Sequence, residues 1–284
     1  MAQNNQQSIQ LGQYNRLKVL SANEYGLDLG FSADESVLLP NRYVEKSMLI
    51  DDWVEVFVYL DSEDRLTATT EDPFAKVGQF AFLQCVEVNR VGAFFDWGLP
   101  KDLLVPFGQQ YKELQPGRFY LLYLYIDNAS QRIVATTKLD RHLDKQTARF
   151  SKGEEVKAIV RRKTDLGYLC IINNSHSALI FKDQTVKHLK VGTELTAYIH
   201  QVRDDGKISL SLHKGAIQAK NALAEQLIEA LENNNGFLPL NDKSKPEDIY
   251  HYFKVSKAIF KRTLGQLYKE RKITIANDGI RLAN

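Results

Sequence analysis

The sequence has few cysteines and prolines and no long apolar run. Its 284 residues include 2 cysteines and 7 prolines, which argues against a disulfide-rich scaffold and a proline-rich disordered chain. Cys85 and Cys170 stand in apolar, strand-like stretches, where we expect buried thiols of a reducing compartment rather than a disulfide. The longest β-like run, residues 119–126, is too short to cross a bilayer, and the first residues lack the pattern of a secretory signal. We therefore predict a cytoplasmic protein without membrane contact.

The sequence also lacks the motifs of the common enzyme classes. It has no phosphate-binding loop, no convincing dinucleotide fingerprint and no nucleophile elbow. Its 6 histidines lack metal-ligand spacing, and neither cysteine has a neighbouring partner for zinc. Acidic groups such as residues 51–52 and 61–64 could suggest a metal-dependent nuclease, but they fall in expected turns, where solvated acids are common. We predict no enzymatic activity, no cofactor and no metal.

A net charge of +2 conceals a gradient along the chain. Residues 1–72 carry 5 Lys/Arg and 13 Asp/Glu, and residues 73–142 carry 8 and 6. Residues 143–213 and 214–284 each carry 12 and 8. A polyanionic ligand would be repelled by the first quarter and attracted to the last half.

Three segments of the chain share the spacing of their marker residues. Glycines at 12, 78 and 153 are each followed 14 residues later by another glycine, at 26, 92 and 167. An apolar residue follows each of these after a further 13 residues, at Leu39, Val105 and Ile180. Each segment ends on a basic residue before a short β-rich run: Arg65, Arg132 and Lys207. Such matched spacing indicates an internal repeat.

Each repeat has the pattern of short strands. The runs 53–60, 119–126 and 195–202 are rich in β-branched and aromatic residues, and Asp204-Asp205-Gly206 is a hairpin signal. The glycines at 26, 92 and 167 are expected to permit a bend or bulge at a barrel corner. About five strands without a crossover helix predict a small, partly open Greek-key barrel of the OB type. The additional residues 139–150 in the second interval are interpreted as a linker.

The pattern becomes helical after about residue 216. A first helix would bury one face made of Ala219, Leu223, Leu227, Ile228 and Leu231. Ser244 to Glu247 predicts a capping box at the start of a second helix. Ser256 would cap a third helix with an inward face of Ile259, Phe260, Thr263, Leu264 and Leu267. With a hairpin around Asn277-Asp278-Gly279, these helices predict a winged helix whose third helix is the recognition helix.

The repeats resemble the S1-type RNA-binding domain. The residues that carry this resemblance are Val91–Phe95, Leu103–Val105, Pro116-Gly117, Asp127–Ile133 and Gly206–Ser211. Three such units followed by the helical region resemble the conserved virulence factor B (CvfB/YitL-like) family of bacterial proteins. We therefore predict a mainly β fold: three five-stranded S1-like OB barrels at residues 1–72, 73–142 and 143–213, then an α+β winged-helix domain at 214–284.

Single-stranded RNA is held by cations on its phosphates and by aromatic rings that stack on its bases. Strand alternation puts Ala93, Phe95 and Trp97 in the core and leaves Phe94 outside. The resemblance implies that a ring at position 94 stacks on RNA; the alternative is an apolar residue covered by a neighbouring domain. The first repeat has Asp28 there, so we expect a poor RNA site in it.

The best RNA surface is expected to run from the second repeat through the third into the winged helix. The basic residues of the third helix could instead form a solvated face on a protein-interaction module. The candidate RNA-binding residues are Arg90, Phe94, Phe107, Arg132, Arg161, Arg162, Lys163, Phe181, Lys182, Arg203, Lys207, Lys257, Lys261, Arg262, Lys269, Arg271 and Lys272.

The resemblance implies a protein that binds single-stranded RNA and regulates gene expression after transcription, with influence on virulence. Two alternatives remain open. The acidic first barrel could dock on the ribosome or on RNA-processing proteins, which would make the chain an adaptor. The winged helix could bind duplex DNA, although a single copy without a dimerisation element would read duplex DNA weakly.

Overall fold

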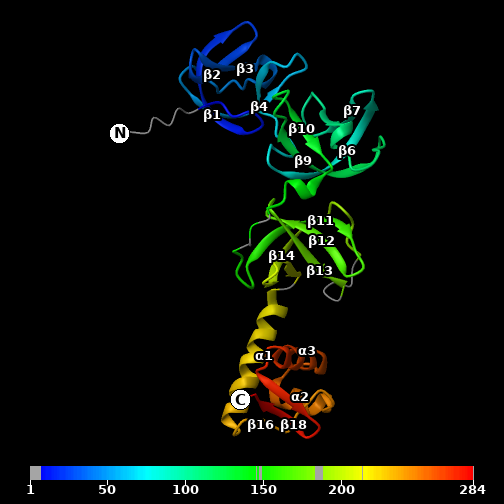
Figure 1. The fold of residues 1–284 in the computed structure, drawn as a ribbon. Coiled ribbons are helices and arrows are strands. Elements are labelled where there is room, and N and C mark those ends of the chain that lie inside the picture. The colour runs from blue at the N-terminus through cyan, green and yellow to red at the C-terminus, as the bar shows by residue number, and fades with distance from the viewer. Residues whose placement is uncertain (1–7, 145, 147–148, 183–187, 213, 284) are drawn as a thin grey trace.

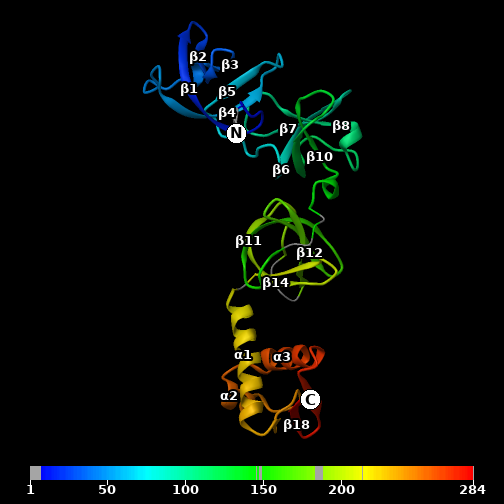
Figure 2. The ribbon, with the colours of Figure 1, turned by 60° about the vertical axis from the view of Figure 1, so that its left-hand side comes forward.

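The structure is a computed structural model that describes residues 8–144, 146, 149–182, 188–212 and 214–283. Three β-barrels and a helical domain follow one another along an elongated molecule (Figures 1 and 2). The mainly β fold with a C-terminal winged helix, predicted from the sequence, is confirmed.

Each barrel is a closed sheet of five strands in the same order. The strands of barrel 1 are β1 (Tyr14–Asn23), β2 (Gly26–Ser32), β3 (Glu35–Pro40), β4 (Trp53–Leu60) and β5 (Leu66–Thr69). Those of barrel 2 are β6 (Phe80–Asn89), β7 (Gly92–Asp96), β8 (Leu103–Pro106), β9 (Phe119–Ile126) and β10 (Ile133–Thr136). Those of barrel 3 are β11 (Glu155–Lys163), β12 (Gly167–Ile172), β13 (His176–Phe181), β14 (Glu194–Val202) and β15 (Ile208–Ser211).

The third and fifth strands of each barrel pair in parallel, and all other barrel pairs are antiparallel. This parallel pairing closes barrels that the sequence predicted to be partly open. Single 3₁₀ turns, η1 (Asn41–Tyr43) and η2 (Phe107–Gln109), follow the third strands of barrels 1 and 2. A third, η3 (Leu139–Arg141), follows barrel 2.

The repeated glycines at 26, 92 and 167 open the second strand of each barrel. A Cβ on Gly92 would lie 2.4 Å from the carbonyl oxygen of Val105, and one on Gly167 would lie 2.0 Å from that of Ile180. The glycine therefore permits a close approach between two strands. The bulge that we expected at this position lies instead in the first strand of each barrel, for example between Val160 and Arg162.

Barrel 1 has a hydrophobic core of its own and also contributes two aromatic side chains to the core of barrel 2. Phe57 and Tyr59 of β4 are buried in the same cluster as Phe95 and Trp97 of barrel 2. The rings of Phe57 and Trp97 meet edge to face, with centroids 5.9 Å apart. Burial of two large aromatic side chains across the junction fixes the two barrels against each other.

Residues 139–144 of the expected linker pack between barrels 2 and 3. Leu139 is buried with Phe80, Leu121, Ile159 and Ile171 in a small cluster that joins the two barrels. His142 stacks on Tyr123 with ring centroids 4.1 Å apart. This packing limits bending at the junction.

The C-terminal domain contains α1 (Lys214–Asn233), α2 (Pro246–Phe253) and α3 (Lys257–Lys269). Its sheet has the order β16-β18-β17, from β16 (Phe237–Leu238), β17 (Ile273–Ala276) and β18 (Gly279–Leu282). The predicted hairpin is confirmed, whereas β16 was not predicted because two residues give no periodic signal. Its core contains Leu223, Leu227, Phe260, Leu264 and Ile280. The side chain of Ala219, predicted for the buried face of α1, lies outside the described residues.

Two local predictions for this domain were wrong. Lys245, rather than Ser244, caps α2 without a side-chain bond, and the Ser244 hydroxyl accepts a hydrogen bond from the Asn241 amide at 2.8 Å instead. Ile259 is exposed, and the buried face of α3 is formed by the other predicted residues, Phe260, Thr263, Leu264 and Leu267. The Ser256 cap is confirmed: its hydroxyl accepts a bond from the Ile259 amide.

Both cysteines are buried and free, as expected. Among the described residues, no helix combines the length and apolarity needed to cross a bilayer.

Candidate nucleic-acid interface

Phe94 of β7 and Arg132, which precedes β10, line one hollow of about 440 Å³ on barrel 2. Phe94 is half-buried, and Ala93, Phe95 and Trp97 are buried, as strand alternation predicted. Leu60 of barrel 1 lines the same hollow. Barrel 1 therefore borders the face on which the sequence analysis placed a stacking ring.

Arg132 forms an ion pair with Asp64, which lies in the β4–β5 turn of barrel 1. Lys101 also binds Asp64, with its ammonium 2.8 Å from the carboxylate, and donates to the Asp61 carbonyl at 2.6 Å. Hydrogen bonding from Lys101, together with the Arg132 charge, lowers the pKa of Asp64. The sequence placed Arg132 on a free RNA face; in the structure an acidic turn of barrel 1 already occupies it.

Two carboxylates, Glu87 and Asp102, also line the hollow on barrel 2. Burial, followed by the nearby charges of Asp96 and Glu87, raises the pKa of Asp102. A phosphate would meet these negative charges, so this face offers a ring for stacking but little net attraction for a polyanion.

Arg90 and Phe107 lie at one end of barrel 2. Arg90 is in the β6–β7 turn, and Phe107 begins η2 directly after β8. The pairing of Gly92 with Pro106 brings these two segments together. Arg90 is exposed, and 52% of Phe107 is accessible.

The corresponding end of barrel 3 brings together a ring and several cations. Lys163 pairs with Tyr168, and Gly167 pairs with Phe181, so the end of β11 and the end of β13 flank the start of β12. Arg162, Lys163 and Lys182 are exposed here, and 39% of Phe181 is accessible. Within the described part of the chain, no ion pair engages Arg162, Lys163 or Lys182.

Arg161 occupies a different environment from its neighbours. Its guanidinium donates two hydrogen bonds to Asp140 of η3, at 2.6 and 2.7 Å, and only 15% of its side chain is accessible. The hydrogen bond from Arg161 lowers the pKa of Asp140. The bulge between Val160 and Arg162 interrupts the strand alternation at this residue. We therefore reassign Arg161 from the RNA surface to the junction between barrels 2 and 3.

The β14–β15 hairpin of barrel 3 carries Arg203 and Lys207. Both are exposed, and both bind Asp205, at 3.3 and 2.9 Å. The Lys207 ammonium, through its hydrogen bond, lowers the pKa of Asp205. The hairpin thus presents two cations that share a single carboxylate.

A basic groove of about 700 Å³ lies between barrel 3 and α3. Lys261, Arg262 and Lys269 line its α3 side together with one carboxylate, Glu270, and Lys152 and His200 line its barrel 3 side. The Lys261 ammonium lies 3.7 Å from Asp242, whereas Lys257 donates to the Lys243 carbonyl at 3.3 Å outside the groove. Lys152 and His200 escaped the sequence analysis because only the packing of two domains brings them to α3.

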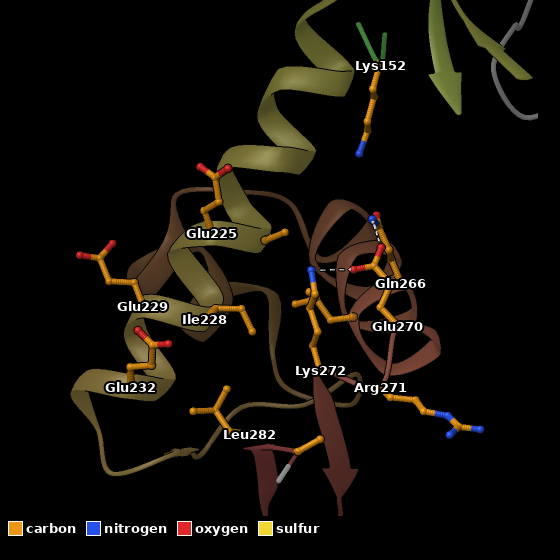
Figure 3. Close-up of a pocket in the computed structure, with 13 residues that line it drawn as sticks. Lys152, Glu225, Ile228, Glu229, Glu232, Gln266, Glu270, Arg271, Lys272 and Leu282 are labelled. Atoms are coloured by element: carbon orange, nitrogen blue, oxygen red, sulfur yellow. Dashed lines mark hydrogen bonds and ion pairs between the residues drawn. The ribbon is translucent and has the colours of Figure 1, made fainter. Parts of the chain in front are cut away.

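Arg271 and Lys272 do not line this basic groove. They line a second hollow, of about 840 Å³, between α1 and α3 (Figure 3). The Lys272 ammonium binds Glu270 at 3.1 Å there. Fifteen of the seventeen candidates thus divide among barrel 2, the end and hairpin of barrel 3, the basic groove and this hollow. The other two are Arg161, at the junction between barrels 2 and 3, and Lys257, outside the groove.

Comparison with known proteins identifies domains at both ends of the chain. Residues 11–71 match the S1 domain, and residues 225–282 match the CvfB-like winged helix domain. The S1 match falls on barrel 1, although the residues that suggested the resemblance lie in barrels 2 and 3. The fold is thus that of a tandem S1-type barrel protein with a CvfB-like winged helix.

The chain is similar to named bacterial proteins over most of its length. YitL of Bacillus subtilis is 29% identical over 273 residues, or 94% of this chain and 91% of YitL. Conserved virulence factor B of Staphylococcus epidermidis is 28% identical over 258 residues, or 88% and 87% of the two chains. A multidomain protein with nucleic acid binding domains from Streptococcus pneumoniae is 25% identical, with a TM-score of 0.41 over 96% of this chain and 98% of that one. The predicted resemblance to the conserved virulence factor B family is confirmed.

Proposed function

We propose that the chain binds nucleic acid, and specifically single-stranded RNA, along its basic half. The bound strand runs from the exposed end of barrel 3 to the groove between barrel 3 and α3. The observation that carries this proposal is that groove, where Lys152, Lys261 and Lys269 from two domains line one hollow. Phosphates gain most where several cations converge, because each neutralised phosphate releases condensed counterions.

The S1 domain match and the exposed ring of Phe181 support single-stranded over double-stranded ligands. Bases of a single strand are free to stack on an aromatic side chain, whereas bases of a duplex are already stacked. The same chemistry supports a non-catalytic role, in which the protein holds a transcript and regulates gene expression after transcription in the cytoplasm. The similarity to a protein named conserved virulence factor B supports an influence of this regulation on virulence.

The test compares affinities for one single-stranded RNA and one DNA duplex of equal length at a single stated salt concentration. We expect tighter binding of RNA, and we expect Lys261→Ala combined with Lys269→Ala to weaken it. The matched control is Lys46→Ala combined with Lys112→Ala, two exposed lysines far from the groove. Preferential binding of the duplex would support a DNA-binding regulator. If the two double variants weaken RNA binding equally, the groove is not the RNA-binding site.

A second candidate function, that of an adaptor, is supported by barrel 1. Its acidic surface exposes Tyr25, Leu49, Ile50 and Trp53, each at least half accessible. Deleting residues 1–72 would be a poor test, since it would remove Phe57 and Tyr59 from the core of barrel 2. The variant Leu49→Ser combined with Trp53→Ala keeps that core. Loss of co-sedimentation with ribosomes in this variant would favour the adaptor.

A further inference from the structure

The hollow between α1 and α3 differs in character from the basic groove. Its floor is apolar, formed by Ile228 of α1, Leu267 of α3 and Leu282 of β18. Figure 3 shows Ile228 and Leu282 directed into the space between α1 and the segment before β17 that carries Lys272. Ile228 and Leu282 are half-buried, so the floor is an apolar surface that remains accessible.

One rim of this hollow is acidic. Glu225, Glu229 and Glu232 follow one another along α1 and are all exposed (Figure 3). Within the described residues, no ion pair engages any of the three. Like charges three and four residues apart on a helix repel each other and destabilise it. A cationic ligand along this rim would relieve that repulsion.

The opposite wall does not balance these charges. The Lys272 ammonium is bound to Glu270, which also accepts a hydrogen bond from the Gln266 amide at 2.6 Å. Hydrogen bonding from Gln266, and then from Lys272, lowers the pKa of Glu270 and keeps it ionised. The side chains of Arg271 and of Glu229 both line the hollow but extend away from its centre in Figure 3. Lys152 of barrel 3 lines this hollow as well as the basic groove, so four carboxylates and three cations line it. The excess of carboxylates lies on the α1 rim, and this rim therefore favours a cation.

We infer that this hollow, hereafter the α1 hollow, is a docking site for a basic amphipathic segment of a partner protein. Apolar side chains of the segment cover Ile228 and Leu282, and its Lys or Arg side chains lie along the three glutamates. Seven residues of helix separate Glu225 from Glu232, which corresponds to about 10 Å. That length matches about two turns of a bound helix.

Nucleic acid is a poor ligand for the α1 hollow, because a phosphate would meet three carboxylates without a partner cation. The winged helix would then bind RNA on the side of α3 that faces barrel 3, and a protein on the side that faces α1. This division does not depend on the RNA proposal, since the charge and floor of the α1 hollow argue for a basic segment by themselves.

The test uses the full-length protein and two fluorescein-labelled 14-residue peptides in fluorescence anisotropy. One peptide has leucines on one helical face and lysines on the other, and its match has glutamates in place of the lysines. We expect the lysine peptide to bind and the glutamate peptide to fail. Equal binding of both peptides would overturn the proposal.

Charge reversal then locates the site. Glu225→Lys, Glu229→Lys and Glu232→Lys together should weaken binding of the lysine peptide by about tenfold or more, since three exposed ion pairs are lost. The matched control reverses Glu24, Glu45 and Glu113, which are also exposed but lie on barrels 1 and 2. If the control weakens binding equally, the peptide is attracted only to the overall charge and the inference is wrong.

The floor is tested separately with Ile228→Gln, which keeps a side chain of similar length but removes its apolar end. We expect weaker binding of the lysine peptide with unchanged single-stranded RNA binding. Unchanged RNA affinity and an unchanged thermal transition report that the domain still folds. A folded Ile228→Gln variant that binds the peptide as well as the parent would refute docking on the floor.

Discussion

Arg161, Arg162 and Lys163 are adjacent in sequence, but the structure gives them different roles. Arg162 and Lys163 are exposed at the end of β11, whereas Arg161 is bound to Asp140. Replacing Arg162 and Lys163 together by alanine should remove two phosphate contacts. Replacing Arg161 alone should remove none.

The expected size follows from counterion release. Each phosphate contact on a single strand contributes about 0.7 to the slope of log affinity against log salt, so the double variant should lose about 1.4. Between about 50 and about 200 mM salt, its affinity should therefore fall about sevenfold less than that of the parent. Fluorescence anisotropy with one labelled single-stranded RNA of about 20 nucleotides, at five salt concentrations, measures both slopes.

The Arg161→Ala variant is the internal control for this experiment. Its slope should equal that of the parent, while its thermal transition should fall because the contact between barrels 2 and 3 is lost. An unchanged slope in the double variant would show that the end of β11 does not contact phosphates. An equal loss of slope in Arg161→Ala would refute the assignment of that residue to the junction.

Three further outcomes follow from the same structure. Phe181→Ala should weaken single-stranded RNA binding at every salt concentration by about 1–3 kcal/mol. Phe94→Ala should weaken it less, because Glu87 and Asp102 line the hollow beside Phe94. Equal losses of RNA affinity in titrations of both variants would contradict this ranking. Gly167→Ala should destabilise barrel 3 by several kcal/mol, because its Cβ would lie 2.0 Å from the Ile180 carbonyl oxygen and a strand would have to move. Gly153→Ala should destabilise it less, because a Cβ there would meet nothing within 4 Å. Denaturant titrations of both variants measure the two free energies of unfolding. The Arg161 guanidinium lowers the pKa of Asp140 in the folded protein. The stabilisation of the junction is therefore complete above the unfolded pKa of about 3.9 and is lost as the pH falls through the lower folded value. The melting temperatures of the parent and of Asp140→Asn should converge at acidic pH, and a difference between them that stays constant with pH would exclude this linkage.

The sequence predicted most of the fold because each barrel has the same steric requirements at the same positions, and these leave the same residue types at the same spacing. The second glycine of each barrel faces a neighbouring backbone carbonyl, and only glycine fits there, so its spacing recurs wherever the barrel does. Alternation along residues 93–97 likewise followed from the two faces of a strand. The start of α3 was predicted from Ser256, whose hydroxyl caps the helix.

The candidate site was less predictable, because its charges depend on neighbouring domains. Neither the pairing of Arg132 with Asp64 nor that of Arg161 with Asp140 has a signal in local spacing, since 68 and 21 residues separate the partners. Lys152 joins the basic groove only because barrel 3 packs beside α3. Long-range ion pairs decide which cations remain available, and a single sequence does not reveal them.

Phe57 and Tyr59 hold barrels 1 and 2 in a fixed relative position, unlike two domains joined by a flexible linker. A flexible tether would spread two bound molecules over many separations and lower their effective concentration. Here the acidic surface of barrel 1 stands at one set distance from Phe94 of barrel 2, since Phe57 and Tyr59 of barrel 1 are buried in the core of barrel 2. Two ligands held on these surfaces would therefore meet in a single relative orientation, without the entropic cost of ordering a linker.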